Sequence, residues 1–344
     1  MFKRPRLSAQ TFPVNAGVAG FLLFYAVSCS GPQEPAEPTP DQSQAPAPEQ
    51  PRDQAEEQAI PPGSLPAVWM TRTLDRPIRS IGITGGAGSS FAVAYETGGL
   101  QLFNFDAERL TSISDHDVKA LAEGRYVMIS GTPVTLYPGI GSEGDMKVWI
   151  YGGGLSEAIE YDLKGGDGAS LAGMCTTRPE TGSDALIRIA YWTEASSTML
   201  EVGDLVERNE ELEWVKTSEL SADQAITACT FTDGEPETFT SPVAGAAGLK
   251  RFNERTLVTL GEDGAIDVRD SEGETERYDI LDGITVVVPD QPKAIAATGD
   301  ARGGGYPGGL IVLGGDIEPG DHRVVMVDPS KITLTPLTAP VAGQ

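Results

Sequence analysis

Short apolar runs that end in an aspartate and a turn recur along the chain. The clearest copies are residues 100–106, 158–162, 199–204, 265–270 and 324–328. Each is preceded by another apolar run, and turn sequences such as Glu262-Asp263-Gly264 separate the two, which is typical of β-hairpins. The preceding runs are residues 90–95, 147–151, 187–192, 256–260 and 310–313.

The spacing of these hairpins predicts a β-propeller. The aspartates recur at intervals of roughly 40–65 residues, close to the length of a four-stranded blade. A blade cannot bury both of its faces alone, so several blades stacked around an axis are the natural solution. The 41 glycines also favour strands and tight turns. A β-sandwich with irregular strands is the alternative.

The N-terminus predicts export. Basic residues precede an apolar stretch within residues 1–28, as in a signal peptide, and the stretch ends in Ala26-Val27-Ser28-Cys29. These four residues resemble a bacterial lipobox, in which cleavage before Cys29 leaves its thiol to carry lipid. Ser30, in place of an aspartate, favours passage to the outer membrane, facing the periplasm. The alternative is an ordinary secretory signal with a chance cysteine.

Composition divides the remaining chain into a linker and one large domain. Residues 29–64 are rich in Pro, Glu, Gln and Ala and poor in large apolar side chains, which predicts a lipid-anchored disordered linker. Its prolines make it extended and semi-stiff. Residues 65–344 are long enough for one all-β domain, and we assign the predicted propeller to them.

The strongly acidic composition limits the range of partners. The net charge is −25, with 50 acidic against 25 basic residues. Nucleic acid and anionic lipid surfaces are therefore excluded as primary ligands, and the predicted membrane contact is the N-terminal lipid. Clustered carboxylates could bind Ca²⁺, but such a charge is more often a solvated surface.

Several segments resemble β-propeller phytases in their order and spacing between Leu65 and Leu334. Pro66-Ala67-Val68-Trp69 looks like the opening of that family, and residues 98–106 followed by Asp117-Val118 look like its next elements. Residues 173–175, 228–233, 309–312 and 323–328 look like later ones. The resemblance implies a six-bladed propeller. It also implies several Ca²⁺ ions at one end of the central channel, which hold phosphate groups and activate water.

The sequence departs from the phytase pattern at positions that bear on this chemistry. Ser64-Leu65 stands where paired aspartates are expected, Glu96 where a lysine is expected, and residues 241–244 where a Glu-Glu pair is expected. Lys293 lies in the late acidic element, where its charge would repel Ca²⁺. The remaining metal-ligand candidates are Asp115 and Asp117, with Glu96 as a weaker one. No catalytic residue is assigned.

Two functions follow from the resemblance and its departures. The first is a catalytically degenerate propeller of the bacterial envelope that binds a ligand or an envelope protein. The alternative is an active calcium-dependent phytase or phosphomonoesterase, acting on phytate or another phosphorylated small molecule. A channel mouth lined by Ser64, Val243 and Lys293 would favour the first, and convergent carboxylates would favour the second.

The chain has three cysteines. With Cys29 assigned to the lipid, Cys175 and Cys229 remain in an export context that permits disulfides. They form either a disulfide or two buried thiols. In the alignment with the phytase family both begin inner strands, which would place them near each other.

The lipobox interpretation predicts that Cys29→Ala protein carries no fatty acid, because the acylated thiol is gone. Metabolic labelling of cells with a fatty acid, followed by isolation of the protein, measures this directly. Label that persists in Cys29→Ala would show that the lipobox interpretation is wrong.

Overall fold

The computed structural model describes residues 61, 63–86, 90–152, 154–163, 170–232, 234–251, 254–270, 273–299 and 308–332. The predicted signal peptide, Cys29 and the linker up to residue 60 lie outside these ranges. Within the ranges, no helix is both long enough and apolar enough to cross a membrane.

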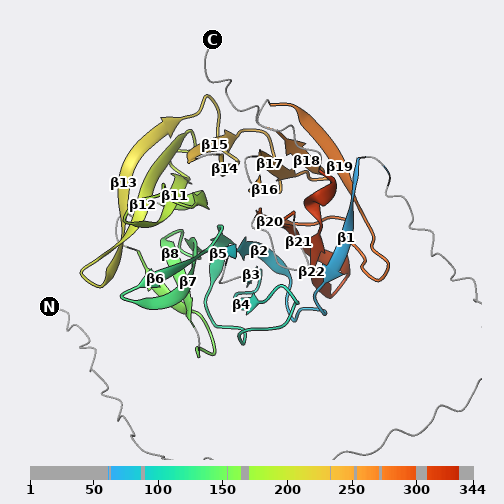
Figure 1. Ribbon diagram of the computed structural model, residues 1–344, viewed down its shortest axis with the longest axis horizontal. Coiled ribbons are helices and arrows are strands. Elements are labelled where there is room, and N and C mark those ends of the chain that lie inside the picture. The colour runs from blue at the N-terminus through green and yellow to red at the C-terminus, as the bar shows by residue number, and fades with distance from the viewer. Residues whose placement is uncertain are drawn as a thin grey trace, which may run out of the picture. The chain divides into compact units, whose positions relative to one another are not determined.

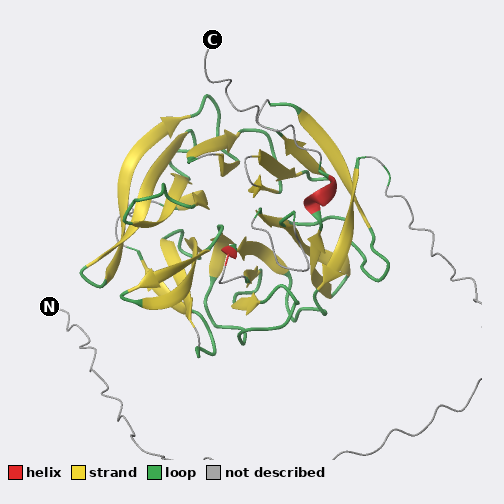
Figure 2. Ribbon diagram, in the orientation of Figure 1, coloured by secondary structure: helices red, strands yellow, loops and turns green. Residues whose placement is uncertain are grey.

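The first half of the described chain forms three blades around a common centre (Figures 1 and 2). Blade 1 consists of β2 (Ile78–Ile83), β3 (Phe91–Tyr95) and β4 (Leu100–Phe103). Blade 2 consists of β5 (Val118–Leu121), β6 (Arg125–Ile129), β7 (Thr132–Gly141), β8 (Met146–Gly152) and β9 (Ile159–Asp162). Blade 3 consists of β10 (Leu171–Thr177), β11 (Ala185–Thr193), β12 (Met199–Arg208) and β13 (Glu211–Ser221).

The second half adds three more blades, which makes the protein an all-β, six-bladed propeller. Blade 4 has two described strands, β14 (Ala228–Thr232) and β15 (Glu235–Phe239). Blade 5 consists of β16 (Gly245–Arg251), β17 (Glu254–Leu260), β18 (Ile266–Arg269) and β19 (Thr275–Leu281). Blade 6 consists of β20 (Ala294–Thr298), β21 (Leu310–Glu318) and β22 (Asp321–Val327), followed by the single-turn helix η2 (Pro329–Lys331).

The N-terminal strand β1 (Ser64–Met70) closes the ring. Its first residues pair in parallel with the end of β19, and Ala67 to Met70 pair antiparallel with β22. Blades 5 and 6 thereby become one 8-stranded sheet. Leu65 lies in the core cluster between these two blades. β1, the first strand of the described chain, is thus paired with strands of the last two blades, which closes the ring.

The first strand of each blade lies next to the channel. β2 packs beside β5 and β20, β16 beside β14 and β20, and β10 beside β14 (Figure 1). Thr84 at the end of β2 forms a parallel bridge with Gly124, so β2 and β5 run in the same direction. All inner strands therefore present their first residues to one end of the channel, as expected for a propeller.

Strands in the middle of a blade are apolar on both faces because each blade is packed between two others. In β3, Val93 packs against blade 6 and Ala92 against blade 2. In β21, Val312 packs against blade 1 and Ile311 against blade 5. This burial explains why the sequence shows continuous apolar runs at these strands, and not the alternation of a half-exposed sheet.

The hairpins predicted from the repeat are confirmed. They correspond to the pairs β3–β4, β8–β9, β11–β12, β17–β18 and β21–β22. The repeat missed blade 4, whose described hairpin is β14–β15. In the sequence, the aspartate of this hairpin follows the first strand and not the second. Residues 228–232 of a segment that resembles the phytase family, however, form β14 of this hairpin.

Ring closure predicts a large stability effect at Leu65, which is fully buried. Leu65→Ala leaves a cavity between blades 5 and 6 and should lower the free energy of unfolding by about 2–5 kcal/mol. Val68→Ala, on the same strand at a position that is 36% exposed, is the matched control and should change it by less than about 1 kcal/mol. Chemical denaturation measures both, and equal effects would contradict the closure.

Candidate functional site

One face of the ring collects the loops that precede the inner strands, and we term it the start face. Asp117 precedes β5 and Lys293 precedes β20. The turn that carries Glu96 also lies there, because Tyr95 at the end of β3 pairs with Ile78 at the start of β2. The predicted metal-ligand candidates therefore lie on one face of the ring.

Asp115, Asp117 and Glu96 come from two adjacent segments. The backbone N–H of Gly99, in the turn after Glu96, donates to the carbonyl of His116 at 2.7 Å. Gly99 has φ +105°, and a Cβ there would lie 2.6 Å from Ile113, so glycine is needed for this contact. The side chains of Asp115 and Asp117 are exposed to solvent.

Lys293 neutralises the carboxylate of Glu96. Its Nζ lies 3.3 Å from Glu96 Oε1 and 3.3 Å from Asp316 Oδ2, so one ammonium bridges blades 1 and 6. The other oxygen of Asp316 lies 2.5 Å from His322 Nδ1. Asp316 and His322 face each other across the β21–β22 hairpin. Sequence analysis missed this pair, although the turn between the two strands would have placed them opposite each other.

Lys293 and Asp316 shift each other's pKa in opposite directions. Partial burial would lower the pKa of Lys293, but its hydrogen bonds to Glu96 and Asp316 raise it above its ordinary value. Burial would raise the pKa of Asp316, but hydrogen bonds from His322 and Lys293 bring it below its ordinary value. A raised lysine pKa and a lowered carboxyl pKa keep both groups charged at neutral pH.

Two arginines add positive charge at the same turn. Arg79 Nη2 donates to the carbonyl of Glu96 at 2.7 Å, and Arg76 Nη1 donates to the carbonyl of Gly98 at 2.6 Å. With Lys293, three cationic side chains surround the turn that carries Glu96. A Ca²⁺ ion needs roughly six to eight oxygen ligands and an excess of negative charge, which this part of the start face does not offer.

Among the described residues, no group of three or more His, Cys, Asp or Glu side chains is arranged to hold a metal ion. Asp115 and Asp117 are exposed, and Glu96 is paired with a lysine. These residues do not fit a multi-calcium centre. The calcium site stays a prediction from the phytase resemblance.

His116, between the two aspartates, has structural partners. Its Nε2 lies 2.9 Å from the carbonyl of Ala158, and its Nδ1 lies 3.3 Å from Glu160 Oε2. Glu160 also accepts hydrogen bonds from Lys147 and Trp149. The histidine therefore ties the loop before β5 to the outer strand β9 of the same blade.

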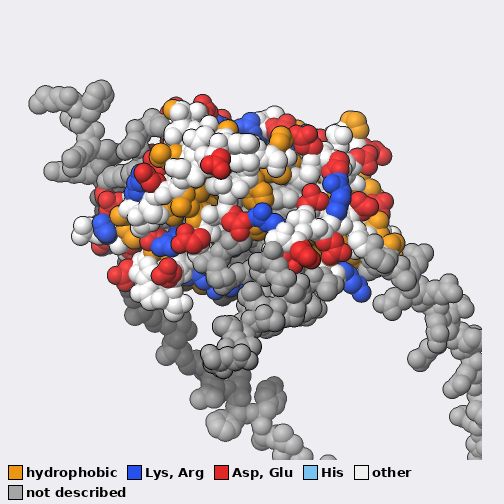
Figure 3. All heavy atoms as spheres, turned by 90° about the horizontal axis from the view of Figure 1, so that it is seen from above, with side chains coloured by type: hydrophobic (Ala, Val, Ile, Leu, Met, Phe, Trp, Pro, Cys, Tyr) orange, Lys and Arg blue, Asp and Glu red, His pale blue; other side chains and the backbone are white. Residues whose placement is uncertain are grey.

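The central channel is narrow. It contains a cavity of about 70 Å³ lined by all six inner strands, with residues such as Ile81, Met174 and Ala296. Figure 3 shows the molecule from one side, where acidic side chains are scattered among basic and hydrophobic ones. On that side the negative charge has the dispersed distribution of a solvated surface.

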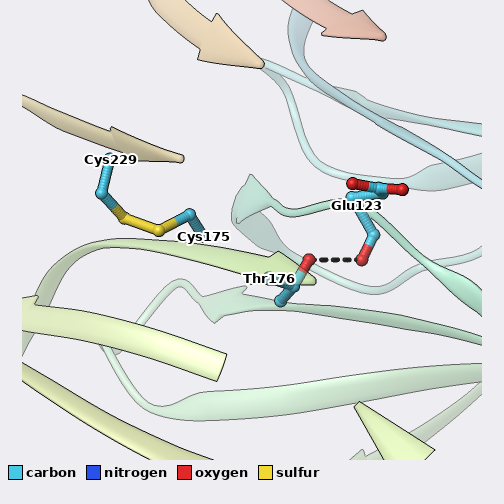
Figure 4. The surroundings of a disulfide bond; sticks show 4 residues. All are labelled: Glu123, Cys175, Thr176 and Cys229. Carbon is cyan, nitrogen blue, oxygen red and sulfur yellow. Dashed lines mark hydrogen bonds between the residues drawn. A yellow bond between two sulfur atoms is a disulfide. The ribbon is translucent and has the colours of Figure 1, made fainter. Parts of the chain in front are cut away.

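A disulfide joins two inner strands at the channel wall. Cys175 in β10 and Cys229 in β14 are bonded, which confirms the predicted bridge (Figure 4). On its other side β10 is held by Thr176, whose Oγ1 donates to the carbonyl of Glu123 at 2.6 Å (Figure 4). A two-stranded hairpin is marginally stable alone, so the disulfide fixes blade 4 to blade 3.

The other altered positions of the phytase pattern are separated by the fold. Val243 precedes β16 and lies near the start face with Lys293. Ser64 instead begins β1, where it pairs with Asp279 of the outer strand β19. Its hydroxyl donates to the carbonyl of Pro61. Ser64 thus belongs to the ring closure, and the channel mouth predicted from Ser64, Val243 and Lys293 is only partly assembled.

Comparisons with known proteins found structural neighbours but no sequence family. No family model matches the chain, and no curated protein matches it. Similar solved structures include AofleA from Arthrobotrys oligospora, with TM-score 0.44, 12% identity, and coverage of 72% of this chain and 82% of AofleA. A triple arginine-to-alanine mutant of AofleA gives TM-score 0.47 at 10% identity, over 72% of this chain and 82% of the mutant.

A second structural neighbour is glutaminyl cyclase from Myxococcus xanthus. It has TM-score 0.39 and 12% identity, with coverage of 77% of this chain and 97% of the cyclase. We draw no functional conclusion from likenesses this distant. The phytase resemblance therefore rests on the sequence elements described above.

The disulfide predicts a large effect on stability, because it closes a loop with a sequence separation of 54 residues. On the chain-entropy model, Cys175→Ala combined with Cys229→Ala should lower the free energy of unfolding by about 4 kcal/mol. Denaturation of the double variant, compared with oxidised wild type, measures this. A double variant as stable as the oxidised protein would show that the bridge does not fasten blade 4.

Proposed function

We propose that this protein is a phytase-like β-propeller lipoprotein of the bacterial envelope that binds a ligand or an envelope protein and does not hydrolyse phosphate esters. In this proposal Cys29 carries the lipid, and the Pro- and Glu-rich linker before β1 holds the propeller away from the outer membrane. The start face serves as a binding surface.

The position of Lys293 carries the proposal. Its ammonium lies between the carboxylates of Glu96 and Asp316, on the start face that also carries Asp115 and Asp117. A resident cation attached to the protein satisfies these carboxylates and repels a divalent ion. Loss of ligand charge lowers calcium affinity steeply, and calcium-dependent activation of water would be lost with it.

The small volume of the channel cavity favours ligand binding at the surface over binding inside the ring. A cavity of about 70 Å³ is smaller than the roughly 300–1,000 Å³ of typical ligand pockets. The exposed carboxylates of Asp115 and Asp117 instead favour a partner that brings positive charge to the start face. Such a partner also suits the acidic composition of the chain.

The proposal predicts that the purified full chain releases no more phosphate from phytate or p-nitrophenyl phosphate with Ca²⁺ than with a chelator. The physical reason is that Lys293 blocks assembly of a cation site beside Glu96. Phosphate release over time measures this directly.

Two variants make the assay decisive. Asp117→Ala tests the exposed metal-ligand candidate, and Asp184→Ala changes an exposed aspartate in the β10–β11 turn. Calcium-dependent phosphate release by wild type that Asp117→Ala abolishes and Asp184→Ala retains would overturn the proposal. It would restore the calcium-dependent phytase alternative.

A further inference from the structure

A cavity lies at the rim of the ring, between the last and the first blade. Its volume is about 620 Å³, within the range of small-molecule sites. One wall is the end of β1 with the segment that follows it, residues 69–74, and the other is Phe103 with the loop 106–109. The cavity is therefore formed only when the ring is closed.

Trp69 gives this cavity an exposed aromatic surface. It is 49% exposed, whereas Trp149, Trp192 and Trp214 are 0%, 6% and 4% exposed. Trp69 is held in place by its backbone, which pairs with Met326 of β22. A large aromatic ring left half in solvent beside a cavity is suited to stack against a ligand with a flat, weakly polar face.

The polar groups around Trp69 are balanced in charge. Arg72 and Arg109 line the cavity together with Asp106 and Glu108. Arg109 pairs with Asp75 at 3.3 Å, and among the described residues Arg72 and Asp106 have no ion-pair partner. The cavity thus offers hydrogen-bond donors and acceptors with no excess of either charge.

The loop that carries Asp106 and Glu108 is preorganised by hydrogen bonds. Asn104 Oδ1 accepts hydrogen bonds from the backbone N–H of Asp106 at 3.0 Å and of Glu108 at 2.8 Å. Asn104 Nδ2 donates to Glu108 Oε2 at 2.9 Å. Ala107 has φ +59°, a conformation that this network holds in place. Such preorganisation reduces the entropy lost when a ligand is bound.

We propose that this rim cavity is a binding site for a neutral saccharide of one to a few sugar units. The C–H face of a sugar ring stacks on Trp69. Its hydroxyl groups, each both donor and acceptor, match the mixture of guanidinium and carboxylate groups. A charged ligand would be repelled either by the two arginines or by the two carboxylates that line the cavity. The net charge of −25 further disfavours an anion.

This inference is independent of the proposed function, because the cavity uses none of Asp115, Asp117, Glu96 and Lys293. Its failure would leave the start face as described, and a phosphatase activity of the start face would leave the cavity as described. The two proposals therefore fail separately.

Tryptophan fluorescence of the full chain tests the site, since Trp69 is the exposed tryptophan of the four. The probes are methyl α-glucoside, methyl α-galactoside, methyl α-mannoside, methyl α-fucoside, N-acetylglucosamine and maltose. Glucuronate and glucosamine are the charged counterparts. We expect a saturable change with at least one neutral probe, with Kd on the order of 0.1–1 mM, and weaker binding of the charged sugars.

Calorimetry measures the same binding in variants that lack the fluorescent reporter. Trp69→Ala should weaken binding about tenfold or more, and Trp69→Phe should weaken it less, because a smaller ring still stacks. Met128→Ala, at an exposed apolar residue on blade 2, should leave binding unchanged. The melting temperatures of the unliganded variants check that each is folded.

Three results would each overturn the proposal. The first is the absence of a saturable response to every neutral probe up to about 10 mM, well above the expected Kd. The second is equal affinity in wild type and in folded Trp69→Ala protein. The third is tighter binding of glucuronate or glucosamine than of the neutral sugars.

Discussion

The pairing of β1 with β19 and β22 is the constraint on which the rest of this structure depends. Every blade is covered on both faces by its neighbours, so the ring is stable only if the last blade also meets the first. β1 contributes Leu65 to the core between blades 5 and 6, and its backbone joins their sheets. The rim cavity at Trp69 and the contact of Lys293 with Glu96 both lie across the junction of blades 6 and 1. They exist because the ring is closed.

Closure also decides the electrostatics of the start face. Glu96 belongs to blade 1 and Asp316 to blade 6, and the ammonium of Lys293 joins them at 3.3 Å from each. These groups are partly exposed, so the pairs contribute little to stability. Their importance is that they reduce the negative charge that the carboxylates can offer to a ligand. A carboxylate that already holds a lysine has lost much of its attraction for a metal ion, and a fold does not by itself imply a chemistry.

Much of the fold could be predicted from the sequence, because blade strands buried on both faces give apolar runs at a regular spacing. The repeat identified five hairpins, and the remaining cysteines gave the bond between Cys175 and Cys229. Contacts between blades that lie far apart in the sequence could not be predicted in this way. Asp316 and His322 are ordinary residues of a hairpin, and their link to Glu96 through Lys293 arises from the ring. Trp69 likewise looked like part of a family motif, and only the closed ring places a cavity beside it.

The central claim is that Lys293 takes the place of a metal ion on the start face. Calorimetric titration of the full chain with Ca²⁺, in wild type and in Lys293→Gln, tests it most directly. The account predicts no saturable binding to wild type at millimolar Ca²⁺. It predicts measurable binding to the variant, in which Glu96 and Asp316 are released from the ammonium. Saturable binding of Ca²⁺ to wild type, unchanged by Lys293→Gln, would contradict it.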